Sequence, residues 1–138
     1  MVQRQILLHM AQLKTILFLG RTDPDTGYDY CVHLCHKNNW KLIVAGGDRV
    51  DASQLIKNVD AVFTTGYLGI VEAFVAGKPV LVYADNPLKK DYLAMHSMSK
   101  YFVYSGNIPK KLALEPQAWA RQQTWDKVTD LYEQLWRR

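Results

Sequence analysis

The sequence predicts an α/β fold: a single doubly wound domain built on a five-stranded parallel sheet of order 2-1-3-4-5, with helices on both faces. Five short apolar runs alternate with segments that carry apolar residues at helical spacing, which is the pattern of successive βαβ units. The runs are almost wholly apolar rather than alternating, as expected of strands that helices cover on both faces. At 138 residues the chain is the size of one domain.

Each predicted strand is a short β-rich run, and each connecting segment repeats apolar residues as an amphipathic helix does. The strands are Thr15–Leu19, Lys41–Ala45, Ala61–Thr64, Pro79–Tyr83 and Tyr101–Tyr104. The helices between them are Tyr28–Asn38, Ser53–Asn58, Ile70–Ala76 and Leu88–Ser97. Right-handed crossovers, with the winding reversed after the second strand, give the order 2-1-3-4-5.

Both ends of the chain are also predicted to be helical. Residues 1–14 form an N-terminal extension whose apolar side would carry Ile6, Leu7, Met10 and Leu13. Residues 116–138 form one long amphipathic helix with Pro116 in its first turn. Its apolar stripe comprises Val128, Leu131, Tyr132, Leu135 and Trp136. An exposed stripe of this kind would indicate a missing partner surface.

The composition is that of a globular protein and excludes several other classes. The chain is 49% hydrophobic and 22% charged, with a formal net charge of +4. No apolar run approaches the roughly 20 residues that cross a bilayer, and no signal peptide is recognisable, so we expect a cytoplasmic protein. Without a stacking-aromatic motif or a basic stripe, we expect no nucleic-acid partner. Lys89, Lys90 and Lys100 near Tyr92 and Tyr101 are either a solvated face or a peripheral contact with anionic lipid at the inner face of the membrane.

The loop after the first predicted strand is a candidate phosphate site. Gly20 follows the strand directly and would let the backbone approach a phosphate closely, while Arg21 would be a forked donor for a diphosphate. The rest of the loop, Asp23 to Gly27, is good turn chemistry, so an exposed turn is the alternative. Ligands of doubly wound sheets bind where the winding reverses, which is beside this loop.

The loop after the third predicted strand would form the other half of the site. It runs Thr64-Thr65-Gly66-Tyr67-Leu68-Gly69-Ile70-Val71-Glu72, a strand end followed by glycines and a helix start. Unpaired amides at a helix N-terminus, together with the helix dipole, favour an anion there, and a pyrophosphate fits this description. We expect Glu72 within the first turn of the helix, where an acid that only stabilises the dipole is the alternative.

Cys31, His33, Cys35 and His36 suggest a metal site, but their spacing argues against one. Residues at i and i+2 on a helix point apart, whereas a closed zinc site needs four ligands that converge. We expect Cys31 and Cys35 to be reduced thiols packed in the core. Two acids flank Pro24 in a context that favours a turn over a metal-binding pair. The sequence therefore predicts no metal.

The loops and strands together resemble the donor-binding half of a known enzyme family. The stretch DAVFTTGYLGIVEAFVAGKPVLV, from Asp60 to Val82, is similar to the donor-site segment of GT-B glycosyltransferases, especially glycosyltransferase family 4. ILFLGRTDPDTGYDY resembles that family's first strand and Gly-Arg loop, LIVAGG its second strand, and QQTWDKVTDLYEQLW its closing helix. The resemblance runs from about Thr15 to Trp136. It implies that residues 1–138 form one Rossmann-like nucleotide-sugar-binding domain.

This resemblance also implies an activity and roles for the site residues. Glu72 would accept hydrogen bonds from the ribose hydroxyls, and Gly20 and Arg21 would face the diphosphate, so that catalysis would depend on Arg21 and Glu72. The chain would serve a metal-independent hexosyltransferase that uses a nucleotide-diphosphate sugar as donor and needs no cofactor. Its partner would be an N-terminal acceptor-binding domain or subunit, or a second copy of the chain. The backbone expected to cradle the diphosphate comprises Gly66, Leu68, Gly69, Ile70 and Val71.

Departures from the family pattern keep other interpretations open. Thr26 stands where the family commonly has a lysine, and Thr64 stands at the first position of its paired-glutamate motif. Between Gly47 and Asp60 the chain is too short for the strand and helix that usually help to hold the base. The alternative is a non-catalytic, degenerate Rossmann module for nucleotide-sugar binding or assembly. A response-regulator-like receiver would need a phosphorylatable aspartate at a central strand end, and none follows Leu19 or Thr64.

Overall fold

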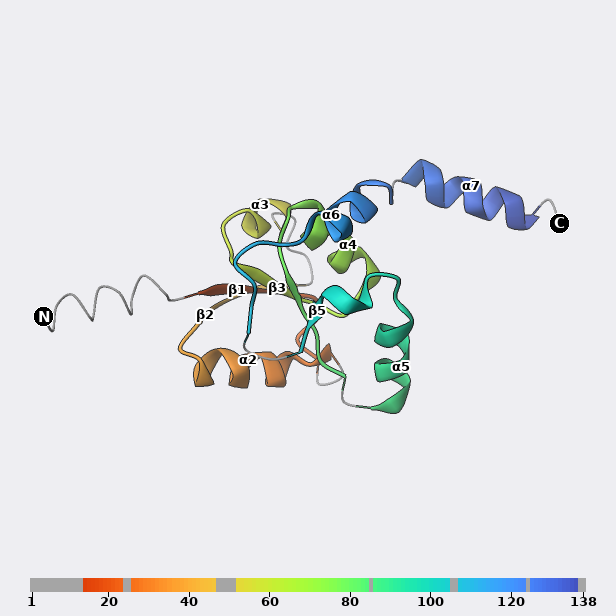
Figure 1. Cartoon of the computed structure of the whole chain (residues 1–138). Helices are drawn as coiled ribbons and strands as arrows, with labels where there is room; N and C mark the ends of the chain where they lie inside the picture. The colour runs from red at the N-terminus through yellow and green to blue at the C-terminus, as the bar shows by residue number, and fades with distance from the viewer. Residues whose placement is uncertain are drawn as a thin grey trace, which may run out of the picture.

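The computed structural model describes residues 14–23, 26–46, 52–84, 86–104, 107–123 and 125–136, and the predicted N-terminal extension lies outside these ranges except for Lys14. A five-stranded parallel sheet crosses the domain in the order β2-β1-β3-β4-β5 (Figure 1), which confirms the predicted topology. Its strands are β1 (Thr15–Leu19), β2 (Lys41–Ala45), β3 (Ala61–Phe63), β4 (Val80–Leu81) and β5 (Phe102–Val103).

The helices also follow the predicted alternation, with shifted ends. They are α2 (Tyr28–Lys37), α3 (Ala52–Ile56), α4 (Tyr67–Val75), α5 (Pro87–Met95), α6 (Leu114–Arg121) and α7 (Trp125–Trp136), with a short 3-10 helix η2 (Ser99–Tyr101) before β5. The shift that matters most is at α4, which begins three residues earlier than the predicted Ile70. Tyr67, Leu68 and Gly69 therefore form its first turn.

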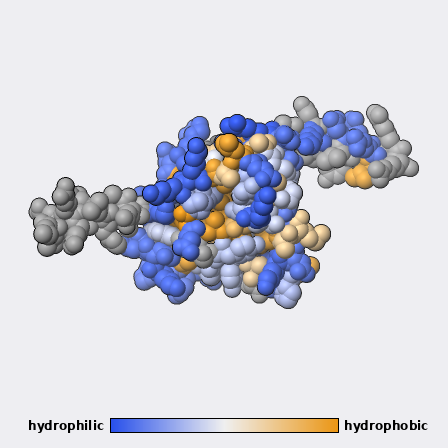
Figure 2. All heavy atoms as spheres, viewed as in Figure 1, coloured by the Kyte–Doolittle hydropathy of each residue, from blue (hydrophilic) through white to orange (hydrophobic). Residues whose placement is uncertain are grey.

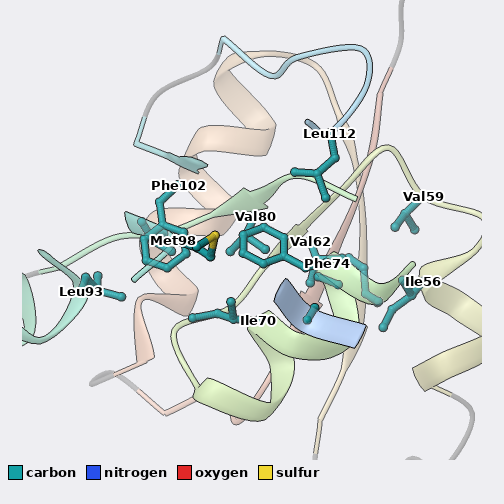
Figure 3. Packing of buried hydrophobic residues seen from close by; sticks show 14 of the residues in the cluster. Ile56, Val59, Val62, Ile70, Phe74, Val80, Leu93, Met98, Phe102 and Leu112 are labelled. Atoms are coloured by element: carbon teal, nitrogen blue, oxygen red, sulfur yellow. The ribbon is translucent and has the colours of Figure 1, made fainter. Parts of the chain in front are cut away.

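Two separate apolar clusters, one on each face of the sheet, hold the helices in place. Strand residues alternate between them: Leu17 and Val62 point into the larger cluster, while Phe18 and Phe63 point into the smaller one. The larger cluster includes side chains of α3, α4, α5 and α6, with Phe74 of α4 near its centre (Figure 3). The smaller cluster includes side chains of α2, which lies on the opposite face (Figure 1).

Gly77 terminates α4, and the sequence Gly77-Lys78-Pro79 is typical of a helix that ends at a glycine. Its φ of 74° is left-handed, a conformation that glycine adopts without the steric cost of a Cβ. The Gly77 amide donates to Phe74 O at 2.9 Å and the Lys78 amide donates to Ala73 O at 2.9 Å, which is a Schellman motif. Pro79 then leads directly into β4, so the turn fixes the position of α4 relative to the sheet.

The prediction of one long C-terminal helix is wrong, because the chain forms α6 and α7 separately. The amides of Gln122 and Gln123 bond to carbonyls three residues back, which tightens and ends α6. Tyr67 of α4 donates its hydroxyl to Gln123 Oε1 at 2.9 Å and so anchors that end. α7 extends away from the α/β body (Figure 1), with Leu135 and Trp136 exposed. The side chains of the remaining stripe residues, Val128, Leu131 and Tyr132, lie outside the described part.

His96, which follows α5, is packed in an aromatic cluster against α6. Its ring centroid lies 5.0 Å from those of both Phe102 and Trp119. The Met98 amide donates to Nδ1 at 3.0 Å, and Nε2 is buried with no hydrogen-bond partner among the described residues. Burial lowers the pKa of His96 below its ordinary value of 6.5, so the folded protein favours the neutral ring.

We therefore expect His96 to destabilise the fold in mild acid. The pKa of His96 is about 6.5 in the unfolded chain and lower in the folded protein, so below about pH 6.5 the unfolded chain binds a proton more readily. The free energy of unfolding therefore falls as the pH is lowered from the pKa of the unfolded state through that of the folded state. Asparagine at this position keeps an acceptor for the Met98 amide but does not titrate. The melting temperature should drop more for the wild type than for His96→Asn between pH 7.5 and 5.5, and parallel curves would contradict this.

Candidate functional site

A cavity of about 270 Å³ opens at the carboxyl ends of β1 and β3, where the winding of the sheet reverses. This is the position at which open α/β sheets bind ligands. The cavity, called the cleft below, combines an apolar floor with polar walls from the two predicted loops. It is lined by Phe18, Leu19, Gly20, Arg21, Thr26, Thr64, Thr65 and Gly66.

Arg21 provides the cation that lines the cleft. Its guanidinium forms an ion pair of 3.0 Å with Asp23. Because the Arg21 side chain is 68% exposed, it is accessible to a ligand in the cleft. Thr26 closes the loop behind it, because its hydroxyl lies 2.7 Å from Arg21 O and 2.8 Å from Asp23 O. Thr26 thus shapes the loop and adds no charge to it.

The loops after β1 and β2 touch at two glycines. The Gly20 amide donates to Ala45 O at 3.1 Å, which extends the ladder between the two strands. The Gly46 backbone lies so close to the Gly20 carbonyl oxygen that a Cβ at position 46 would overlap with it. Glycine at position 46 therefore allows the β2 end to hold the Gly20–Arg21 backbone at the rim of the cleft.

The N-terminus of α4 forms the opposite wall. Gly66 is its N-cap and lines the cleft, and no side chain of the described residues caps the helix there. The first helical bond is donated by the Ile70 amide to Gly66 O at 3.0 Å. The amides of Tyr67, Leu68 and Gly69 precede that bond and are the donors that a helix N-terminus leaves for an anion.

The structure thus brings some of the predicted site residues together and separates others. Gly20, Arg21 and Gly66 line one cleft. Leu68 and Gly69 lie in the uncapped first turn of α4, whereas the amides of Ile70 and Val71 fall within the helical ladder. The amides that precede the first helical bond are therefore those of Tyr67, Leu68 and Gly69, because α4 starts earlier than expected.

Glu72 lies in the second turn of α4, not in the first as predicted. It is exposed and lines a second cavity, of about 480 Å³, between α3 and α4. The other residues of this α3–α4 cavity are Ile56, Lys57, Val71, Val75 and Ala76. The favourable effect of a helix dipole on an acid fades beyond the first turn, so a purely dipole-stabilising role no longer explains Glu72.

Thr65 belongs to the site although sequence reasoning gave it no role. It lines both the cleft and a third cavity, of about 190 Å³, that leads toward α5. This α5 cavity is also lined by Tyr83, Lys89, Tyr92 and Leu93. The signal for it in the sequence was the place of Thr65 and Tyr83 two residues after the ends of the neighbouring strands β3 and β4, where the carboxyl ends of a parallel sheet meet.

The cysteine and histidine residues of α2 do not form a common site. Cys31 and Cys35 are buried against the sheet, whereas His33 and His36 are exposed on the outer side of the helix. The hydrogen bond with Cys35, together with burial, raises the pKa of the Cys31 thiol far above its usual range. Cys31 therefore stays protonated and packs as a small apolar side chain.

Comparison of the chain with protein-family models, with curated protein sequences and with solved structures yields no match. Within the described ranges, no helix combines the length and the apolar character that a membrane span needs.

Proposed function

We propose that this domain binds the nucleotide-diphosphate sugar of a glycosyl transfer reaction, with the diphosphate in the cleft. One observation carries the proposal: Arg21 and the uncapped N-terminus of α4 line the same cavity, at the reversal point of a doubly wound sheet. A forked cation and oriented amides are complementary to a diphosphate. The same groups would stabilise the negative charge that builds on the diphosphate as it leaves the sugar.

The nucleoside would extend from the cleft along the exposed side of α4. Leu68, which is 59% exposed, lies in the first turn, and Glu72 follows it one turn later, about 6 Å along the helix axis. A carboxylate there can accept hydrogen bonds from both hydroxyls of a ribose. The α3–α4 cavity beyond Glu72 is lined mainly by apolar residues and could accept the base.

Glutamine at position 72 should weaken nucleotide binding by about three- to tenfold, because neutral hydrogen bonds to the ribose replace charge-assisted ones. The loss should be smaller with 2′-deoxynucleotides, which keep only one of the two ribose hydroxyls, and the affinity for inorganic pyrophosphate should not change. Isothermal titration with UDP, GDP, their 2′-deoxy forms and pyrophosphate measures these differences.

The matched control is Asp91→Asn, which removes an exposed carboxylate from α5. It should leave all of these affinities unchanged. If Glu72→Gln binds UDP and GDP as the wild type does, Glu72 has no contact with the ribose and the nucleoside lies elsewhere.

A non-catalytic binding module is the second candidate, and the two threonines favour it. Thr26 closes the first loop, and Thr64 is 4% exposed and packs against Gly69, so neither provides the charge found in the resembled family. Mixing the chain with a candidate acceptor-domain protein, a UDP- or GDP-hexose and an acceptor distinguishes the two functions. Sugar transfer supports the enzyme, whereas nucleotide-sugar binding without turnover supports the module.

A further inference from the structure

The α5 cavity adjoins the cleft on the side away from Glu72. Thr65 lines both cavities, so the α5 cavity lies next to the proposed diphosphate seat. The α3–α4 cavity shares no lining residue with either of them. The two groups attached to a diphosphate in the cleft could therefore lie in different places, one along α4 toward Glu72 and one past Thr65 toward α5.

We infer that the α5 cavity holds the hexose ring of the donor, an inference that rests on the proposed function. With the nucleoside directed along α4, the group on the other phosphate would enter past Thr65. The cavity of about 190 Å³ is smaller than the roughly 300–1,000 Å³ of sites for drug-sized ligands, so it suits a single ring. A nucleoside, which has two rings or more, needs more room.

Two tyrosine rings give this cavity the chemistry that a sugar requires. Tyr83 is held in place by Tyr30 of α2, whose ring stacks on it at a centroid distance of 4.0 Å and an interplanar angle of 9°. Tyr92 lies on α5 and is 53% exposed. A tyrosine offers an apolar ring face and a polar hydroxyl, which match the C–H face and the hydroxyl rim of a pyranose.

Thr65 and Lys89 add polar groups to the lining of the same cavity. The threonine hydroxyl can donate and accept a hydrogen bond, and the lysine ammonium can donate to sugar hydroxyls. The Lys89 backbone is fixed by the Asn86 side chain, which caps α5 and accepts from the Lys89 amide at 2.8 Å. The cavity thus combines few but well-placed polar groups with aromatic surface, as in other small-molecule sites.

If the α5 cavity holds the hexose, the protein should bind a sugar nucleotide more tightly than the free nucleotide. Titration of the wild type and variants with UDP and UDP-glucose, and with GDP and GDP-mannose, gives the ratio of the affinity for the sugar nucleotide to that for the free nucleotide. Tyr92→Ala should reduce the ratio about three- to tenfold and leave the affinity for UDP or GDP unchanged, because only the sugar contacts the ring. Tyr92→Phe should keep most of the ratio.

Met95→Ala is the matched control on the same helix. Met95 is 84% exposed and lies at the C-terminal end of α5, where Figure 2 shows apolar residues at the surface, and it does not line the cavity. This variant should bind both ligands as the wild type does. Because Tyr92 is also largely exposed, neither substitution should prevent folding, and a melting curve verifies this.

Three results would overturn the inference, and they differ from one another. An unchanged ratio in Tyr92→Ala would place the hexose outside the α5 cavity. An equal loss for the free nucleotide and the sugar nucleotide would assign the cavity to the nucleoside. If the wild type binds none of the four ligands, the proposed function fails together with this inference.

Discussion

Replacing Gly46 by alanine should lower the melting temperature by about 10 °C, since overpacking costs about 3 kcal/mol and a domain of this size loses a few degrees per kcal/mol. The new Cβ would overlap with the Gly20 carbonyl oxygen, which is backbone and cannot rotate away. Relief requires the ends of β1 and β2 to separate, which strains the bond from the Gly20 amide to Ala45 O. Differential scanning calorimetry measures the loss directly.

The control for this substitution is Gly66→Ala. Gly66 has a φ of −82°, and a Cβ there would meet nothing within 4 Å. Alanine is a poorer N-cap than glycine, so we expect a loss of only about 2–4 °C. Similar losses for the two variants would mean that the contact between the loops after β1 and β2 contributes little to the fold.

Removing the guanidinium of Arg21 should weaken the binding of UDP or GDP by about 10- to 100-fold, as expected for the loss of charge-assisted hydrogen bonds to a diphosphate. Inorganic pyrophosphate should lose affinity by a similar factor, because the contact is to the phosphates alone. The melting temperature of Arg21→Ala should stay close to that of the wild type, because the ion pair with Asp23 is exposed. Titration and calorimetry of the same sample separate the two effects.

Arg121→Ala removes an exposed arginine from α6 and serves as the charge-matched control. It should leave nucleotide affinity unchanged at moderate salt, where charges at a distance are screened. Arg21→Lys should retain part of the affinity, because lysine keeps the charge but loses the fork. If Arg21→Ala and Arg121→Ala weaken binding equally, the effect is one of net charge, and the cleft is not the diphosphate seat.

The prediction of the sheet from the sequence succeeded because its signals are local. Each strand is a continuous apolar run, and the right-handed crossover rule leaves few ways to arrange such runs. The position of the cleft followed from the same reasoning, since the strand order alone defines the reversal point between β1 and β3. Gly20, Arg21 and Gly66 could be named because they lie in the loops that follow those two strands.

The start of α4 was harder to predict, and the error affected the site. The segment from Gly66 to Gly69 has two glycines, which favour a loop, but Tyr67 packs edge-on against Trp119 of α6 and donates to Gln123. These contacts come from α6 and the residues just after it, more than 50 residues later in the chain, so no local pattern shows them. They stabilise the early first turn that places Glu72 in the second turn.

Apolar periodicity and crossover handedness act along the chain, so the order of the strands, the two faces of the core and the position of the reversal point follow from the sequence. How the carboxyl edge of the sheet is divided into cavities depends on the tertiary structure. The tertiary structure separates Glu72 from the cleft, gives Thr26 a role in closing the loop and places a tyrosine-lined cavity next to the cleft at Thr65. The division depends on which side chains from distant segments fill the space between elements, and that is a property of packing in three dimensions.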